Sequence, residues 1–168
     1  RIDDASWRGV EVGSLSLSVE SLRGAAQATL AIPDLRVSGQ GRIRAAESPA
    51  LTANVVFDAS PLASLATLMP RGVPLGGSIS GSLELDMPLG APETTTIEAQ
   101  VEALALTSGR FSAQSRGPFA LRVRGSRVEV QGLGLQGPGL SLEVSGSIGT
   151  VSSAPLALRA SASVDLAE

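Results

Sequence analysis

The side chains of this chain that are best suited to catalysis are paired carboxylates. Glu84 and Asp86 lie two residues apart in one segment, and Glu98 and Glu102 lie four apart in another. Such pairs can hydrolyse glycosidic bonds when they flank a cleft. A sugar cleft would also need stacking aromatic rings, and the 168 residues include one Trp, three Phe and no Tyr. We therefore expect these carboxylates to lie on a solvated outer face.

Arginine carries all of the positive charge, because the chain contains neither Lys nor His. Arg122, Arg124 and Arg127 form a cluster near Arg116 that could bind a lipid phosphate or an acidic partner. A solvent-facing role that favours solubility is the simpler interpretation. The net charge of −3 and the scarcity of aromatic residues argue against a nucleic-acid partner.

The residue types that are missing exclude most enzyme classes. Without Cys, His and Lys there is no thiolate nucleophile, imidazole base or Schiff base, and no zinc or haem site of the usual kind. We expect no enzymatic activity, no cofactor and no metal. No run of about 18 apolar residues predicts a membrane-spanning helix, and the first residues do not resemble a signal peptide.

One glycine-rich segment, Gly132–Gly137, has the form G-x-G-x-x-G. A dinucleotide site would need a helix directly after this motif and an acidic residue about 20 positions further on. Alternating residues at 140–144 follow it instead, and no acidic residue lies at that distance. We interpret the motif as a glycine-rich strand or a β-bulge.

The dominant pattern is the alternation of apolar and polar residues along the whole chain. Successive side chains of a strand point to opposite faces, so each alternating segment predicts a strand with one apolar and one polar face. The pattern predicts an all-β fold of about ten to twelve strands in an antiparallel or mixed sheet. The clearest segments are 15–20, 79–87, 97–102, 119–124, 140–145 and 156–166.

One segment departs from alternation and predicts a short amphipathic helix at about 61–69. Ser60 suits the N-cap and Pro61 the first helical position. Pro70 and Gly72 would end the helix. The apolar residues at helical spacing are Leu62, Leu65, Leu68 and Met69.

The chain also resembles itself at a spacing of about 106 residues. Gly41 and Gly146 are each followed two residues later by Ile, and Leu35 and Leu140 have the same separation. We interpret residues 1–168 as a single fragment without an internal domain boundary, made of one unit of a repetitive β protein and part of the next. Chance matching among Ala, Leu and Ser residues is the alternative.

The apolar positions hold medium aliphatic residues thinned by small ones. Small side chains leave space, so a sheet that folded over on itself would enclose an apolar trough. Each methylene of a ligand buried there would gain about 0.8 kcal/mol. The alternative, that neighbouring side chains fill the space, remains open. The small residues that we expect to point inward are Ala99, Ala103, Gly81, Gly146, Ala160 and Ala162.

Several motifs resemble the TamB proteins and the wider AsmA-like group. Residues 57–62 (FDASPL) precede the predicted leucine helix, and residues 77–85 (GSISGSLEL) with Gly90 and Pro92 are similar to the hairpin that follows this helix in the family. The stretches 140–146 and 155–166 resemble the recurrent end of a family unit. The likeness covers nearly the whole chain.

This resemblance implies a curved, U-shaped β-taco with an apolar groove, in the periplasm of a didermic bacterium. Such proteins are anchored in the inner membrane, here outside this fragment, and carry phospholipid acyl chains towards the outer membrane, where a TamA-like protein is a partner. The family offers no catalytic residues. The residues that would line the groove are Leu83, Leu85, Val101, Leu121, Val123, Leu142, Val144 and Leu158.

Two other functions fit the same sequence. An assembly module could add a strand of an outer-membrane or secreted protein at an open sheet edge. A passive β-solenoid stalk would need a tightly filled interior and no groove.

Overall fold

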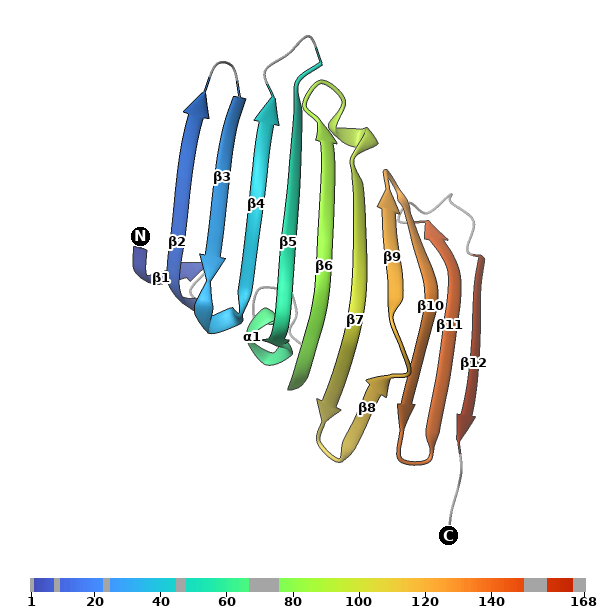
Figure 1. Cartoon of the computed structure of the whole chain (residues 1–168). Coiled ribbons are helices and arrows are strands. Elements are labelled where there is room, and N and C mark those ends of the chain that lie inside the picture. Colours follow the sequence, from blue (N-terminus) through green and yellow to red (C-terminus); the bar gives the residue numbers. More distant parts are fainter. Residues whose placement is uncertain are drawn as a thin grey trace.

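The structure is a computed structural model that describes residues 2–7, 10–22, 25–44, 48–66, 76–149 and 157–164. Twelve strands form one sheet, and every strand pair is antiparallel (Figure 1). The expected all-β fold is therefore confirmed. The strands are β1 (Ile2–Trp7), β2 (Val10–Leu22), β3 (Ala25–Ile32), β4 (Val37–Arg44), β5 (Ala50–Pro61), β6 (Gly76–Pro88), β7 (Thr96–Ser108), β8 (Phe111–Ser115), β9 (Phe119–Arg124), β10 (Arg127–Gly137), β11 (Leu140–Gly149) and β12 (Ala157–Val164).

The strands follow one another across the sheet in chain order, with one exception. β8 and β9 share a single position between β7 and β10, and residues 116–118 separate them. Two 3-10 turns, η1 (Pro33–Leu35) and η2 (Pro92–Thr94), join β3 to β4 and β6 to β7. Short connections between neighbours explain why this chain forms a meander in one layer.

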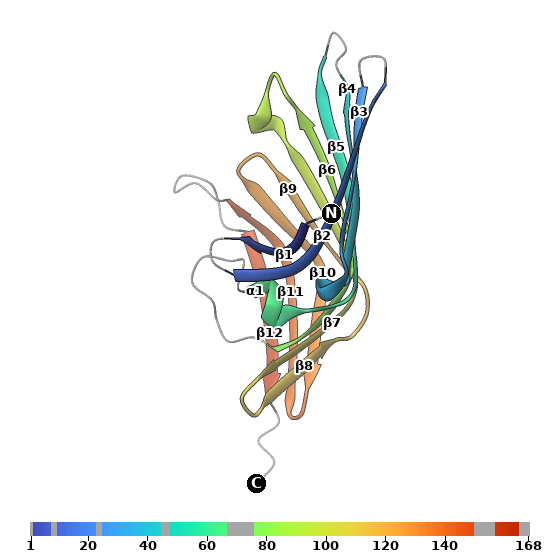
Figure 2. The same cartoon turned by 90° about the vertical axis from the view of Figure 1, so that its left-hand side faces the viewer.

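The sheet is curved along its strands. In Figure 2 the lower parts of β2, β5 and β7 turn to the left, and β1 and α1 (Leu62–Ala66) lie on that same side. A flat sheet of this many strands would be unusual, because strands carry a right-handed twist.

The helix begins one residue later than its capping pattern predicts. Pro61 still belongs to β5, where it is opposite Ser78. Ser60 is fully buried and its hydroxyl donates to the carbonyl oxygen of Arg36 at 3.0 Å, so the predicted N-cap role is wrong. A buried hydroxyl needs a hydrogen-bond partner, and for Ser60 this partner is the carbonyl oxygen of Arg36 rather than a backbone N–H of the helix. The predicted end of the helix at 67–69, with Pro70 and Gly72, lies outside the described residues.

Apart from two register shifts in the β1–β2 pair, register shifts mark three places where one strand holds an extra residue. They lie in β5 after Phe57, in β7 after Val101 and in β10 after Val130. A β-bulge of this kind bends the strand that carries it. The G-x-G-x-x-G segment lies inside β10, and Gly132 takes a φ of 73° in the bulge. The interpretation as a glycine-rich bulge is therefore confirmed.

The bulge in β7 also corrects one prediction. Ala103 is exposed and opposite Ser80, on the polar side of β6, so it does not point inward. The next apolar residue, Leu104, is opposite Ile79. The extra residue Glu102 shifts the alternation by one position, which keeps the aliphatic side chains of β7 on one face.

The residues matched by the internal repeat lie in comparable strands, with one exception. Gly41 of β4 is opposite Ala28 and Ala53, and Gly146 of β11 is opposite Val130 and Leu158. Leu35, in contrast, belongs to η1 whereas Leu140 begins β11. The repeat remains a prediction.

At the bulge of β7, the backbone of Gly81 packs closely against the neighbouring strand, and a substitution at this glycine tests how much that packing contributes to stability. Its φ is 152°, and a methyl group there would overlap the carbonyl oxygen of Gln100. We expect Gly81→Ala to lower the free energy of unfolding by about 1–3 kcal/mol, the usual cost of a strained backbone position. Gly90→Ala is the control, because nothing lies within 4 Å of that added methyl. Urea unfolding of both variants checks this, and equal midpoints would contradict it.

Candidate functional site: an apolar face and a polar face

The eight predicted lining residues lie on one face of the sheet, which we call the apolar face. Leu85 of β6 and Val123 of β9 are both opposite Ile97 of β7. Since residues directly opposite each other share a face, the three form a row across the strands. The eight residues are Leu83, Leu85, Val101, Leu121, Val123, Leu142, Val144 and Leu158.

The same face continues through the C-terminal strands. Leu121 is opposite Val130, which is opposite Gly146, which in turn is opposite Leu158 of β12. Val144 lies two residues before Gly146 and therefore points to the same side. The geometry brings all eight side chains onto one continuous surface.

Much of the apolar face is open to solvent, because the described strands form a single layer. Leu17, Val19 and Val164 are exposed by 53%, 62% and 59%. Seven of the eight predicted lining residues are half-buried, and Val101 is buried. Large contiguous patches of exposed aliphatic side chains are uncommon on monomeric soluble proteins, where they often belong to interaction sites.

One row of the apolar face is better packed than the rest. Val37, Phe57, Gly81, Val101 and Phe119 are opposite one another in turn across β4, β5, β6, β7 and β9. Four of the five are buried, and Phe57 packs against the buried pair Leu35 and Val37. This row, which we call the buried row, forms the nearest equivalent of a hydrophobic core.

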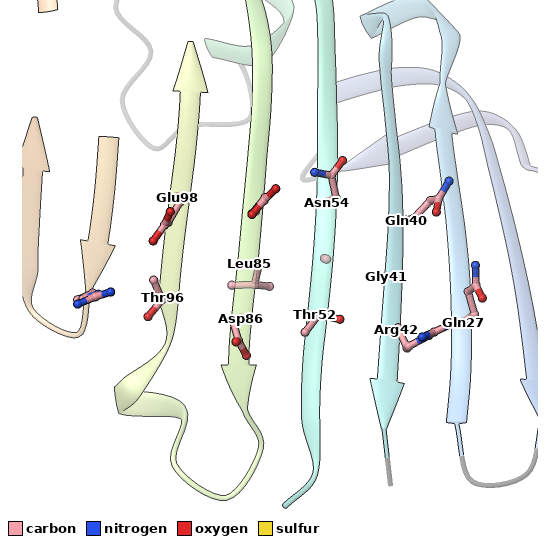
Figure 3. Close-up of a pocket in the computed structure, with 13 residues that line it drawn as sticks. Gln27, Gln40, Gly41, Arg42, Thr52, Asn54, Leu85, Asp86, Thr96 and Glu98 are labelled. Atoms are coloured by element: carbon pink, nitrogen blue, oxygen red, sulfur yellow. The ribbon is translucent and has the colours of Figure 1, made fainter. Parts of the chain in front are cut away.

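The opposite face is polar and contains a hollow of about 680 Å³ (Figure 3). Amide and hydroxyl side chains from β3, β4, β5 and β7 line the hollow together with the exposed carboxylates Glu84 and Asp86. No local sequence pattern predicts this hollow, because the hollow combines polar positions from strands whose pairing only the fold determines. The other residues that border the hollow are Gln27, Gln40, Arg42, Thr52, Asn54, Thr96, Glu98 and Arg124, together with Gly41, Ala53 and Leu85, three positions that alternate onto the apolar face.

Ion pairs join several of the arginines and carboxylates on the polar face. Arg122 lies 2.9 Å from Glu98, and Arg116 lies 2.8 Å from Glu143. Exposed pairs of this kind contribute at most about 1 kcal/mol each. The arginine cluster is thus partly neutralised, and Glu84 and Glu98 lie opposite each other on neighbouring strands rather than around a cleft with a buried acid.

The fold and the face together define this chain as a curved, single-layer antiparallel sheet with one apolar side. In comparisons with family models, curated proteins and solved structures, nothing matches the chain. Within the described ranges, no helix is long and apolar enough to cross a membrane, and no three acidic, His or Cys side chains gather as metal ligands.

Proposed function

We propose that this chain is a segment of a periplasmic, bridge-like protein of the TamB and AsmA-like kind, whose apolar face shelters phospholipid acyl chains between the inner and outer membranes. The observation that carries the proposal is the continuous apolar surface from β2 to β12, left open by a single-layer sheet. An acyl chain is a ligand of matching chemistry, because it needs apolar contact along its length and no hydrogen bonds.

The free energy available on this face is sufficient for such a ligand. A dozen methylenes transferred from water at about 0.8 kcal/mol each would gain up to about 10 kcal/mol before the costs of ordering. Small residues such as Ala99 and Gly146 lie between larger aliphatic neighbours, so they leave a depression that has room for an acyl chain. The polar head group would remain in water.

The length of the sheet is consistent with a segment of a longer bridge. Strands stack at about 4.8 Å, so eleven positions extend only about 50 Å. Several such segments in series would be needed to cross the space between two membranes. An inner-membrane anchor and a TamA-like outer-membrane partner belong to the proposal for the whole protein, and no catalytic step is required.

Lipid analysis of the purified chain tests the proposal. We expect chain exported to the periplasm of a didermic bacterium and purified without detergent to contain phospholipid, because the open apolar face lowers its free energy by binding acyl chains. Mass spectrometry of an organic extract measures the lipid. A protein of similar size from the same compartment controls for carry-over, and an extract no richer in phospholipid than that control would contradict the proposal.

A strand-addition function is the second candidate, because β12 is paired on only one side within the described residues. An open edge is a template for an extended polypeptide. Lipid-free chain that binds an extended peptide, with loss of exchange at β12 amides, would favour this scaffold function over lipid transport.

A further inference from the structure

The bulges of β5, β7 and β10 and the break between β8 and β9 fall on one line across the sheet. Ser80 of β6 faces the bulge of β5 on one side and is adjacent to that of β7 on the other. The break at 116–118 follows between β7 and β10, and the bulge of β10 faces Ser145 of β11. The irregularities of these strands are therefore aligned, and we call this line the crease.

The backbone groups freed at the crease have specific partners. The N–H of Ala59 donates to the hydroxyl of Ser80 at 3.0 Å, and the N–H of Leu104 donates to the hydroxyl of Ser115 at 3.0 Å. The carbonyl oxygen of Arg36 accepts from the N–H of Asp58 at 3.0 Å. A bulge removes ladder bonds, and an unpaired buried N–H is costly, so serine hydroxyls placed here stabilise the bent form.

The backbone φ angles at the crease also indicate that the bend is a fixed feature of the folded sheet. Ala59 takes a φ of 48°, and Gly81, Gly132 and Gly146 take 152°, 73° and 127°. Positive φ values are costly for ordinary residues and are kept only where the surroundings enforce them. The buried row runs along the same line on the apolar face, and it packs the bend from that side.

We infer that the crease is a preset fold axis of the sheet, held by the hydroxyls of Ser80 and Ser115, which fixes the angle between the two parts of the apolar face. The axis runs across the strands, in the direction in which a longer repeat would extend. Its consequence for lipid, a channel of fixed width, rests on the proposed function, whereas the bend itself does not.

Distance measurement between two spin labels tests the inference. The chain contains no cysteine, so Gly90→Cys and Arg110→Cys introduce the only two label sites, in exposed turns at opposite ends of β7. We expect Ser80→Ala combined with Ser115→Ala to lengthen the mean distance by several ångströms and to broaden its distribution. The double variant Ser82→Ala with Ser112→Ala removes one hydroxyl from each of the same two strands but keeps the hydroxyls of Ser80 and Ser115, so it should leave both unchanged.

Two further measurements keep the inference testable if the alanine variant does not fold. Ser80→Thr with Ser115→Thr retains both hydroxyls and should keep the parent distance. In the parent chain, the amides of Ala59 and Leu104 should exchange slowly with solvent deuterium. Equal distances in the crease and control variants, or fast exchange at both amides, would overturn the inference. Lipid-free chain with a preset bend would refute the proposed function alone.

Discussion

On the proposed lipid-binding function, replacing Val123 by Arg is expected to remove most of the phospholipid bound by the chain. Val123 is half-buried on the apolar face, opposite Ile97 and Val128. A buried valine-sized contact is worth about 1.5–3 kcal/mol, and each 1.4 kcal/mol is about a factor of ten in affinity. We therefore expect the bound lipid to fall at least about tenfold, because the charged group also brings water onto the apolar face.

Val56→Arg is the matched control for this experiment. Val56 also lies in the middle of a strand, but it is opposite Ser38 and Ser82 on the polar face and is 42% exposed. Its replacement should leave the lipid content unchanged, since that face does not bind acyl chains. Circular dichroism confirms that both variants keep the sheet. Equal lipid in the two folded variants would mean that the apolar face does not hold the lipid.

Alternation was sufficient to predict the all-β fold and the face on which each predicted lining residue lies. The reason is physical: a strand has a period of two, and the aliphatic residues of one face must share a side of the sheet. For Leu121 and Val123, which lie in a regular strand, the sequence pattern determines the placement. For these two residues, only the pairing of their strand with β7 and β10 had to be supplied by the structure.

The bulges were harder to predict, although a signal for them exists. In β7 the aliphatic residues Val101 and Leu104 are three positions apart, and in β10 Val130 and Leu133 are also three apart. An odd spacing inside an alternating run indicates one extra residue. Ala103 obscured this signal in β7, because alanine is tolerated on either face and appeared to continue the alternation.

The polar hollow and the role of Ser60 depend on contacts that no local pattern encodes. Ser60 bonds to a carbonyl 24 positions away in sequence, which a capping rule based on neighbouring residues cannot detect. The hollow combines side chains that meet only once β3, β4, β5, β6, β7 and β9 are in register. Long-range register, rather than composition, determined both.

The buried row provides the prediction with the largest effect on stability. Phe119→Ala should lower the free energy of unfolding by about 3–5 kcal/mol, because it leaves a cavity where a 6% exposed ring packs beside Val101. Phe111→Ala removes the same ring from a position that is 45% exposed, so it should cost only about 0.5 kcal/mol. Urea unfolding followed by circular dichroism measures both variants. A large difference would mean that a single-layer sheet obtains its stability from one packed row and leaves the remaining apolar face free to bind. Equal costs would mean that the backbone ladders hold the sheet and that the buried row is not its core.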